Sequence, residues 1–74
     1  MKRPIKAHLA PHEIPRMFDD PRISWKAKGI MMFIVGCQGS MDAERIAASG
    51  ANGIGSVRSG LKELEKAGYI IFEQ

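Results

Sequence analysis

The spacing of apolar residues in the last third of the chain predicts an amphipathic helix over residues 53–67. Four apolar residues recur there at intervals of three and four, which puts them on one helical face: Ile54, Val57, Leu61 and Leu64. Gly68 follows the last helix-forming residues and can adopt the left-handed conformation that ends helices. The apolar residues within 69–73 then predict a short strand.

Two further helices are expected before this one. The first spans 24–36, since Ser24 is a suitable N-cap and the residues after it are apolar almost all round, as in a central core helix. The second spans 40–49, with Ser40 as N-cap and acidic residues in its first turn. It is rich in alanine, and a glycine-containing turn joins it to the helix at 53–67. This pair matches the helix-turn-helix arrangement.

The N-terminal segment, residues 1–23, contains all four prolines. Prolines exclude a long helix but permit a short strand near 5–9 and one helical turn near 15–18. Apolar residues spread along the segment indicate that it packs onto the body of the protein: Ile5, Leu9, Ile14, Met17, Phe18 and Ile23. We expect the strand within 69–73 either to pair with the strand near 5–9 or to continue into a returning strand beyond Gln74.

Length and composition narrow the class of protein. A chain of 74 residues forms one domain with a small core, which disfavours a multistep enzyme with a deep pocket. Cys37 is the only cysteine, so an internal disulfide is excluded. The longest apolar run, 30–35, is too short to span a bilayer, and the basic N-terminus lacks the apolar core of a signal peptide. The expected location is the cytoplasm, with no membrane partner.

The net charge of +3 is concentrated near the N-terminus, where residues 1–28 hold seven basic and three acidic side chains. Such an imbalance suits a polyanionic partner, although ordinary solvated charge is an equally simple explanation. Lys2, Arg3 and Lys6 form either a flexible arm that adds affinity or an idle basic terminus.

Two stretches resemble a known family. They are DPRISWKAKGIMMFIV and, after the alanine-rich helix, SVRSGLKELEKAGYI. Over about residues 19–72 the chain is similar to winged-helix domains near the N-terminus of phage and plasmid replication initiators and replisome organisers. The resemblance implies a mainly α (α+β) fold: a three-helix winged helix-turn-helix with a two- or three-stranded antiparallel sheet. It also implies binding of double-stranded DNA in a replication or transcription-regulatory protein, as a homodimer or with a protein partner.

In this architecture the second helix of the motif enters the major groove. The best-placed side chains at its start and along its length are Asn52, Ser56, Arg58, Ser59 and Lys62. Arg58 engages either a guanine edge or a phosphate, and Asn52 either reads adenine or caps the helix. Three basic residues beside the start of the helix at 24–36 are candidates for phosphate contacts, or else solubilise the surface: Arg22, Lys26 and Lys28.

Trp25, the only tryptophan, is expected to anchor the core, with stacking on a nucleobase as the alternative. Gly53, Gly55 and Gly60 lie in or beside the supposed recognition helix. They either allow the backbone to approach phosphate or loosen the helix, at roughly 1 kcal/mol each in a helix interior.

Other chemistry is not supported by the sequence. His8 and His12 are separated by Pro11, and no HExxH pattern occurs, so no metal ligands are predicted. The Gly-Ile-Gly at 53–55 lacks the preceding strand and the further glycine of a dinucleotide site. Cys37 has no base nearby in sequence, which favours a structural thiol. We therefore predict no enzyme activity, no cofactor and no catalytic residues.

The alternative function is a protein-interaction module of the same fold, which docks a partner through the helix at 53–67 or the apolar edge at 70–72. One geometric condition discriminates between the two functions. A DNA reader needs Arg58 and Lys62 on the same exposed face as Lys26 or Arg22, and separation of these groups favours the interaction module.

Overall fold

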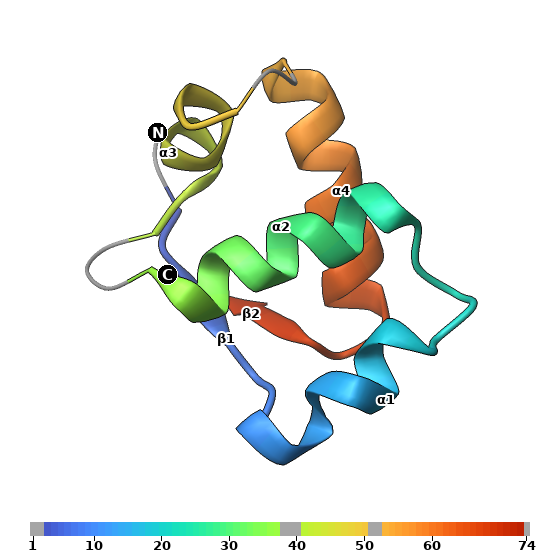
Figure 1. Cartoon of the computed structure of the whole chain (residues 1–74). Coiled ribbons are helices and arrows are strands. Elements are labelled where there is room, and N and C mark those ends of the chain that lie inside the picture. Colours follow the sequence, from blue (N-terminus) through green and yellow to red (C-terminus); the bar gives the residue numbers. More distant parts are fainter. Residues whose placement is uncertain (1–2, 38–40, 51–52, 74) are drawn as a thin grey trace.

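The computed structural model describes residues 3–37, 41–50 and 53–73 (Figure 1). The fold is α+β, with helices packed against a small antiparallel sheet. In chain order the elements are β1 (Ile5–Ala7), the 3-10 turn η1 (Pro11–Glu13), α1 (Ile14–Phe18), α2 (Trp25–Gly36), α3 (Ala43–Ala48), α4 (Ile54–Lys66) and β2 (Ile70–Phe72).

β1 and β2 pair in antiparallel register, with Ile5 opposite Phe72. The His8 N–H donates to the Tyr69 carbonyl at 2.8 Å and extends the pairing by one residue. The pairing of the N-terminal segment with the C-terminal strand, one of the two arrangements expected from the sequence, is confirmed. At its other edge β1 donates from the Ile5 N–H to the Met41 carbonyl, also at 2.8 Å. β1 therefore lies between β2 and the segment that precedes α3.

α2 begins where the sequence predicts. The Ser24 hydroxyl accepts from the Ala27 N–H at 3.2 Å, which satisfies one of the free amides at the helix start. The Glu63 carboxylate of α4 accepts from the Ser24 N–H at 2.7 Å and from its hydroxyl at 3.1 Å. These bonds tie the start of α2 to α4, which α2 crosses (Figure 1).

α3 is shorter than the helix expected at 40–49. Its N-cap is Asp42, whose carboxylate accepts from the Arg45 N–H at 2.8 Å, so the helix begins at Ala43. Ser40, the expected cap, lies outside the described residues. Asp42, which the sequence analysis put in the first turn, is itself a good N-cap residue, because its carboxylate can accept from a free amide at the helix start.

α4 ends as predicted, at a glycine in the left-handed conformation. Gly68 has φ = 87°, and its N–H donates to the Glu65 carbonyl at 3.0 Å. The Tyr69 N–H donates to the Leu64 carbonyl at 2.9 Å, which completes a Schellman motif and directs the chain into β2.

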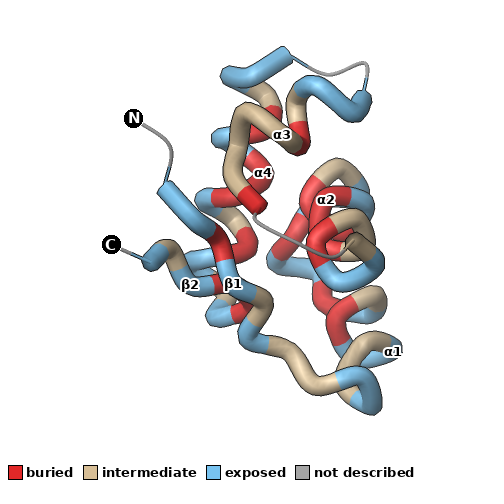
Figure 2. The backbone as a smooth tube through the Cα atoms, turned by 90° about the vertical axis from the view of Figure 1, so that its left-hand side faces the viewer, coloured by how far each residue is buried: buried red, intermediate tan, exposed pale blue. Residues whose placement is uncertain are grey.

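The core forms between α2, α4 and the sheet, where the buried residues of these elements gather (Figure 2). Of the four apolar residues expected on the α4 face, three are buried and Ile54, in the first turn, is exposed. Gly60 is buried in the crossing, and a Cβ on it would lie 2.7 Å from the Ile30 Cδ1 atom and 3.5 Å from the Lys26 Cε atom. Gly60 therefore permits close helix packing and does not face outward toward a phosphate, which corrects the sequence interpretation.

Candidate nucleic-acid interface

Arg58 and Lys62 lie about one turn apart on α4, on the side directed toward α3 and the sheet. The Arg58 Nη2 atom is 3.4 Å from Glu44 Oε2 on α3. Arg58 and Lys62 border a groove of about 270 Å³, and Arg3 completes the basic rim with its guanidinium 4.8 Å from the centre of the Phe72 ring. Three cations from two distant parts of the chain thus share one groove, together with the carboxylates of Glu44 and Glu65.

The remaining recognition-helix candidates differ in accessibility. Ser59 is exposed, and Ser56, one turn earlier, is partly buried. Asn52 lies outside the described residues. Gly53 occupies the N-cap position of α4 without any side chain to cap the first amides, so the described start of the helix presents backbone N–H groups.

Lys26 lies on the opposite flank of α4 from Arg58 and Lys62. Its side chain runs beside Gly60, and at about 100° per residue both α4 cations are about 160° from Gly60 around the helix. Lys26 therefore does not share a face with Arg58 and Lys62, so this half of the condition set for DNA reading is not met. Arg22 lines a separate groove with Glu63, Lys66 and Ala67 near the end of α4.

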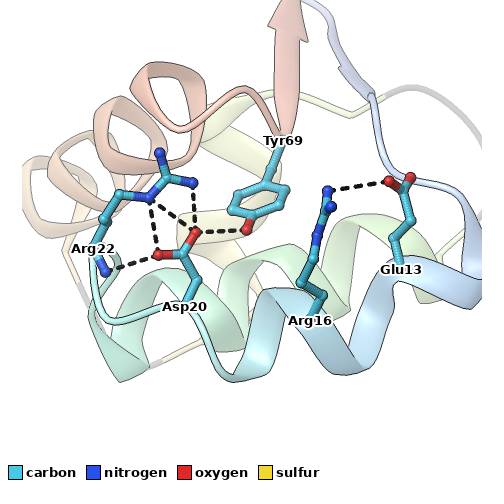
Figure 3. Close-up of polar contacts among 5 residues, drawn as sticks. All are labelled: Glu13, Arg16, Asp20, Arg22 and Tyr69. Carbon is cyan, nitrogen blue, oxygen red and sulfur yellow. Dashed lines mark hydrogen bonds and ion pairs between the residues drawn. The ribbon is translucent and has the colours of Figure 1, made fainter.

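Arg22 is held in a polar cluster beside α1 (Figure 3). Its Nη2 atom donates to Asp20 Oδ2 at 2.7 Å and its Nε atom donates to Oδ1 at 3.0 Å. The Arg22 backbone N–H also donates to Oδ1, at 2.9 Å, and the Tyr69 hydroxyl donates to Oδ2 at 2.6 Å. Arg22 is consequently committed to a contact within the protein, and its charge is largely balanced by Asp20.

Hydrogen bonds from Arg22 and then Tyr69 hold the pKa of Asp20 well below its usual range. The same carboxylate raises the pKa of the Tyr69 phenol, because the hydrogen bond that the neutral hydroxyl donates to Asp20 is lost when the phenol ionises. A second pair lies nearby in Figure 3, where Arg16 contacts Glu13 at 3.2 Å. The pKa of Glu13 is lowered chiefly because its carboxylate accepts from the Ala10 N–H. All of these carboxyl groups stay ionised at neutral pH.

Trp25 is 76% exposed, so the prediction that it anchors the core is wrong. It is the first residue of α2, and the core side of that helix is supplied by smaller residues such as Ala27 and Met31. Lys28 is 6% exposed, with its Nζ atom 4.4 Å from the centre of the Trp25 ring. The lysine stem is buried and its ammonium lies against the indole, which leaves Lys28 little surface for a phosphate contact.

The cluster of Asp20 and Tyr69 was not identified from the sequence. In the turn Asp20-Pro21-Arg22 the Asp20 carboxylate accepts a hydrogen bond from the Arg22 backbone N–H. Aspartate before proline is a local sequence pattern typical of such a turn, so this part of the cluster could have been predicted. The contact with Tyr69 spans 49 residues, and no spacing rule relates two such positions.

Comparison with protein-family models, with curated proteins and with solved structures found no match for this chain. Within residues 3–37, 41–50 and 53–73, no helix is long and apolar enough to cross a membrane. In the same ranges no three His, Cys, Asp or Glu side chains gather as metal ligands would.

Proposed function

We propose that this chain is a winged-helix domain that binds double-stranded DNA through α4, as part of a replication or transcription-regulatory protein. The observation that carries the proposal is the groove between α3, α4 and the sheet, where Arg58 and Lys62 are joined by Arg3. Ser59 adds an exposed hydroxyl on the same helix. Phosphate contacts from these cations would orient α4, and Arg58 or Ser59 would read base edges.

The sheet fits the α+β part of the proposal and departs from the usual winged-helix scheme in its pairing. In that scheme the strand after the recognition helix pairs with a strand that returns from the wing. Here β1 pairs with β2, so the N-terminal strand takes the part of the returning strand. Arg3, just before β1, brings a positive charge to the edge of the DNA-facing groove, where a wing would contact the backbone.

The ion pair between Arg58 and Glu44 does not oppose this role. Arg58 is exposed, Glu44 is partly exposed and the separation is 3.4 Å, so the pair contributes about 0–1 kcal/mol and leaves Arg58 able to turn toward a phosphate. Glu44 and Glu65 reduce the positive potential of the groove. We therefore expect modest affinity with a steep dependence on salt.

The test is fluorescence anisotropy with random-sequence duplex DNA at low and moderate salt. Arg58→Ala is compared with Arg16→Ala, which removes the same charge from an exposed arginine that also pairs with a glutamate. Arg58→Ala should weaken binding and lower the slope of log K against log salt by about 0.9, whereas Arg16→Ala should do neither. Absence of binding at low salt, or equal losses in both variants, would exclude α4 as the DNA-binding element.

A second candidate, a protein-interaction module of the same fold, is favoured by the separation of the α4 and α2 cations. It is also favoured by Ile71, which is 47% exposed on β2, a strand paired on one edge only within the described residues. Sedimentation over a range of concentrations tests self-association. A mass that rises with concentration in the native chain, but not in Ile71→Lys, would support this function.

A further inference from the structure

Trp25 borders a groove of about 310 Å³ between α2, the end of α3 and α4. Gly29 lines the groove one turn along α2 from Trp25, and a Cβ added there would meet no atom within 4 Å. Phe33 follows one further turn along and also lines it. The groove is thus an open aromatic surface near the lower limit of about 300 Å³ for small-molecule sites, which suits one flat group.

Positive charge surrounds these aromatic rings. The Lys28 Nζ atom lies 4.4 Å from the Trp25 ring centre, and the Arg45 guanidinium carbon lies 6.0 Å from the Phe33 ring centre. Lys26 lines the groove and makes no ion pair with another described residue. No acidic side chain is among the described residues that line the groove, and the Glu63 carboxylate of α4 is hydrogen-bonded to Ser24.

We propose that this groove binds an unpaired nucleobase of single-stranded nucleic acid, with the base stacked on Trp25 and a phosphate at Lys26. Aromatic side chains beside a positively charged groove are the usual basis of single-strand binding, because every base has a flat face and every nucleotide carries a phosphate. The Lys28 ammonium lies over one face of the indole, so the base would stack on the opposite face. The proposal does not rest on duplex binding by α4.

Trp25 itself reports on the proposed contact, because it is the only tryptophan and is exposed. The native chain is titrated at low salt with oligothymidylate, with the ribose equivalent and with an abasic DNA strand, all of about eight nucleotides. Saturable quenching of tryptophan fluorescence is expected with the strands that carry bases and not with the abasic strand. The two base-bearing strands establish whether DNA or RNA binds more tightly.

Three variants separate stacking from general charge attraction. Trp25→Ala should weaken binding of labelled oligothymidylate by at least about fivefold, as for loss of one base–aromatic stack. Lys26→Ala should weaken it and lower the salt slope by about 0.7. Val35→Ala, exposed near the other end of α2, should bind as the native chain does.

Arg58→Ala distinguishes this site from the duplex site, since it should retain full quenching by the single strand. The proposal is overturned if no strand quenches Trp25, if the abasic strand quenches equally, or if Trp25→Ala binds as tightly as the native chain. Circular dichroism of each variant establishes that the helices are intact.

Discussion

The Asp20 carboxylate is buried and hydrogen-bonded on both oxygens. It is 8% exposed and accepts hydrogen bonds from the Arg22 side chain and backbone and from the Tyr69 hydroxyl. A carboxylate removed from water is tolerated only when such partners replace its hydration. Asp20 therefore links the turn before α2 to the residue that follows α4 (Figure 3).

Tyr69→Phe tests this link at neutral pH. The substitution keeps the ring, which is buried, and removes the donor 2.6 Å from Asp20 Oδ2. We expect the free energy of unfolding to fall by roughly 1–2 kcal/mol, because a charged acceptor loses one of its bonds. Urea denaturation followed by circular dichroism measures the change. An unaltered midpoint would mean that water or Arg22 fully replaces the phenol.

The same carboxylate makes stability dependent on pH. The pKa of Asp20 is depressed in the folded chain, so the carboxylate binds protons more readily after unfolding. Its contribution is complete above the unfolded value of about 4 and is lost as the pH falls toward the folded value. We expect the urea midpoint to fall as the pH is lowered from about 5 toward 2, and less steeply in Asp20→Asn.

Glu13→Gln is the control for this pH dependence, because Glu13 has a lowered pKa from a separate cause, the Ala10 N–H. Glu13→Gln should remove only the part of the pH dependence that comes from Glu13, and the part that comes from Asp20 should remain. A native pH profile unchanged by Asp20→Asn would contradict the assignment.

At the residue scale, sequence reasoning succeeded where one local feature determines the outcome. Ser24 as a cap and Gly68 as a helix end depend on neighbours within four residues, and both are confirmed. Trp25 failed because size and apolarity favour burial only on a face that meets the core, and the first residue of α2 does not. Lys28 beside Trp25 is a consequence of that same exposure.

At the level of elements, the crossing of α2 and α4 depends on a residue without a side chain. Gly60 is three residues after Val57 and four before Leu64, so helical periodicity puts it on the buried face. A count of apolar side chains omits glycine, which is why the packing role was not predicted. Ile30 of α2 fills the space that a Cβ on Gly60 would need.

Gly60→Ala and Gly29→Ala test this packing as a pair. Both alanines gain up to about 1 kcal/mol of helix propensity, but only the Cβ at position 60 would lie 2.7 Å from Ile30 Cδ1. We expect Gly60→Ala to be less stable than Gly29→Ala by about 1–2 kcal/mol, measured by urea denaturation. Ile30→Val removes the clashing Cδ1 atom, so the cost of Gly60→Ala should shrink in that background. Equal effects in both backgrounds would show that Ile30 moves aside freely.

At the scale of the whole molecule, the N-terminal strand β1 pairs with the C-terminal strand β2. β1 and β2 come from opposite ends of the chain, and β1 also bonds to Met41, so one short strand joins three segments (Figure 1). α4 was predictable from apolar periodicity, and α2 and α3 from caps and helix-forming residues, but the strand pairing was one of two open arrangements because it depends on long-range geometry. The separation of the basic residues onto two flanks of α4 was likewise not readable from charge counts.

Ile5→Ala tests how much the molecule depends on β1. Ile5 is buried in the core, and truncation of such a residue costs about 2–5 kcal/mol. A domain of this size has roughly 4–11 kcal/mol in total, at about 0.05–0.15 kcal/mol per residue. We therefore expect Ile5→Ala to lower the thermal midpoint sharply, while Lys6→Ala, exposed on the same strand, changes stability by no more than about 0.5 kcal/mol.

Because Ile5 and Ile70 pack in one core, unfolding should remain a single transition that lowers helix and sheet signals together. Helices that survive unchanged in Ile5→Ala would mean that the strand pair is an appendage and that α2, α3 and α4 fold without it.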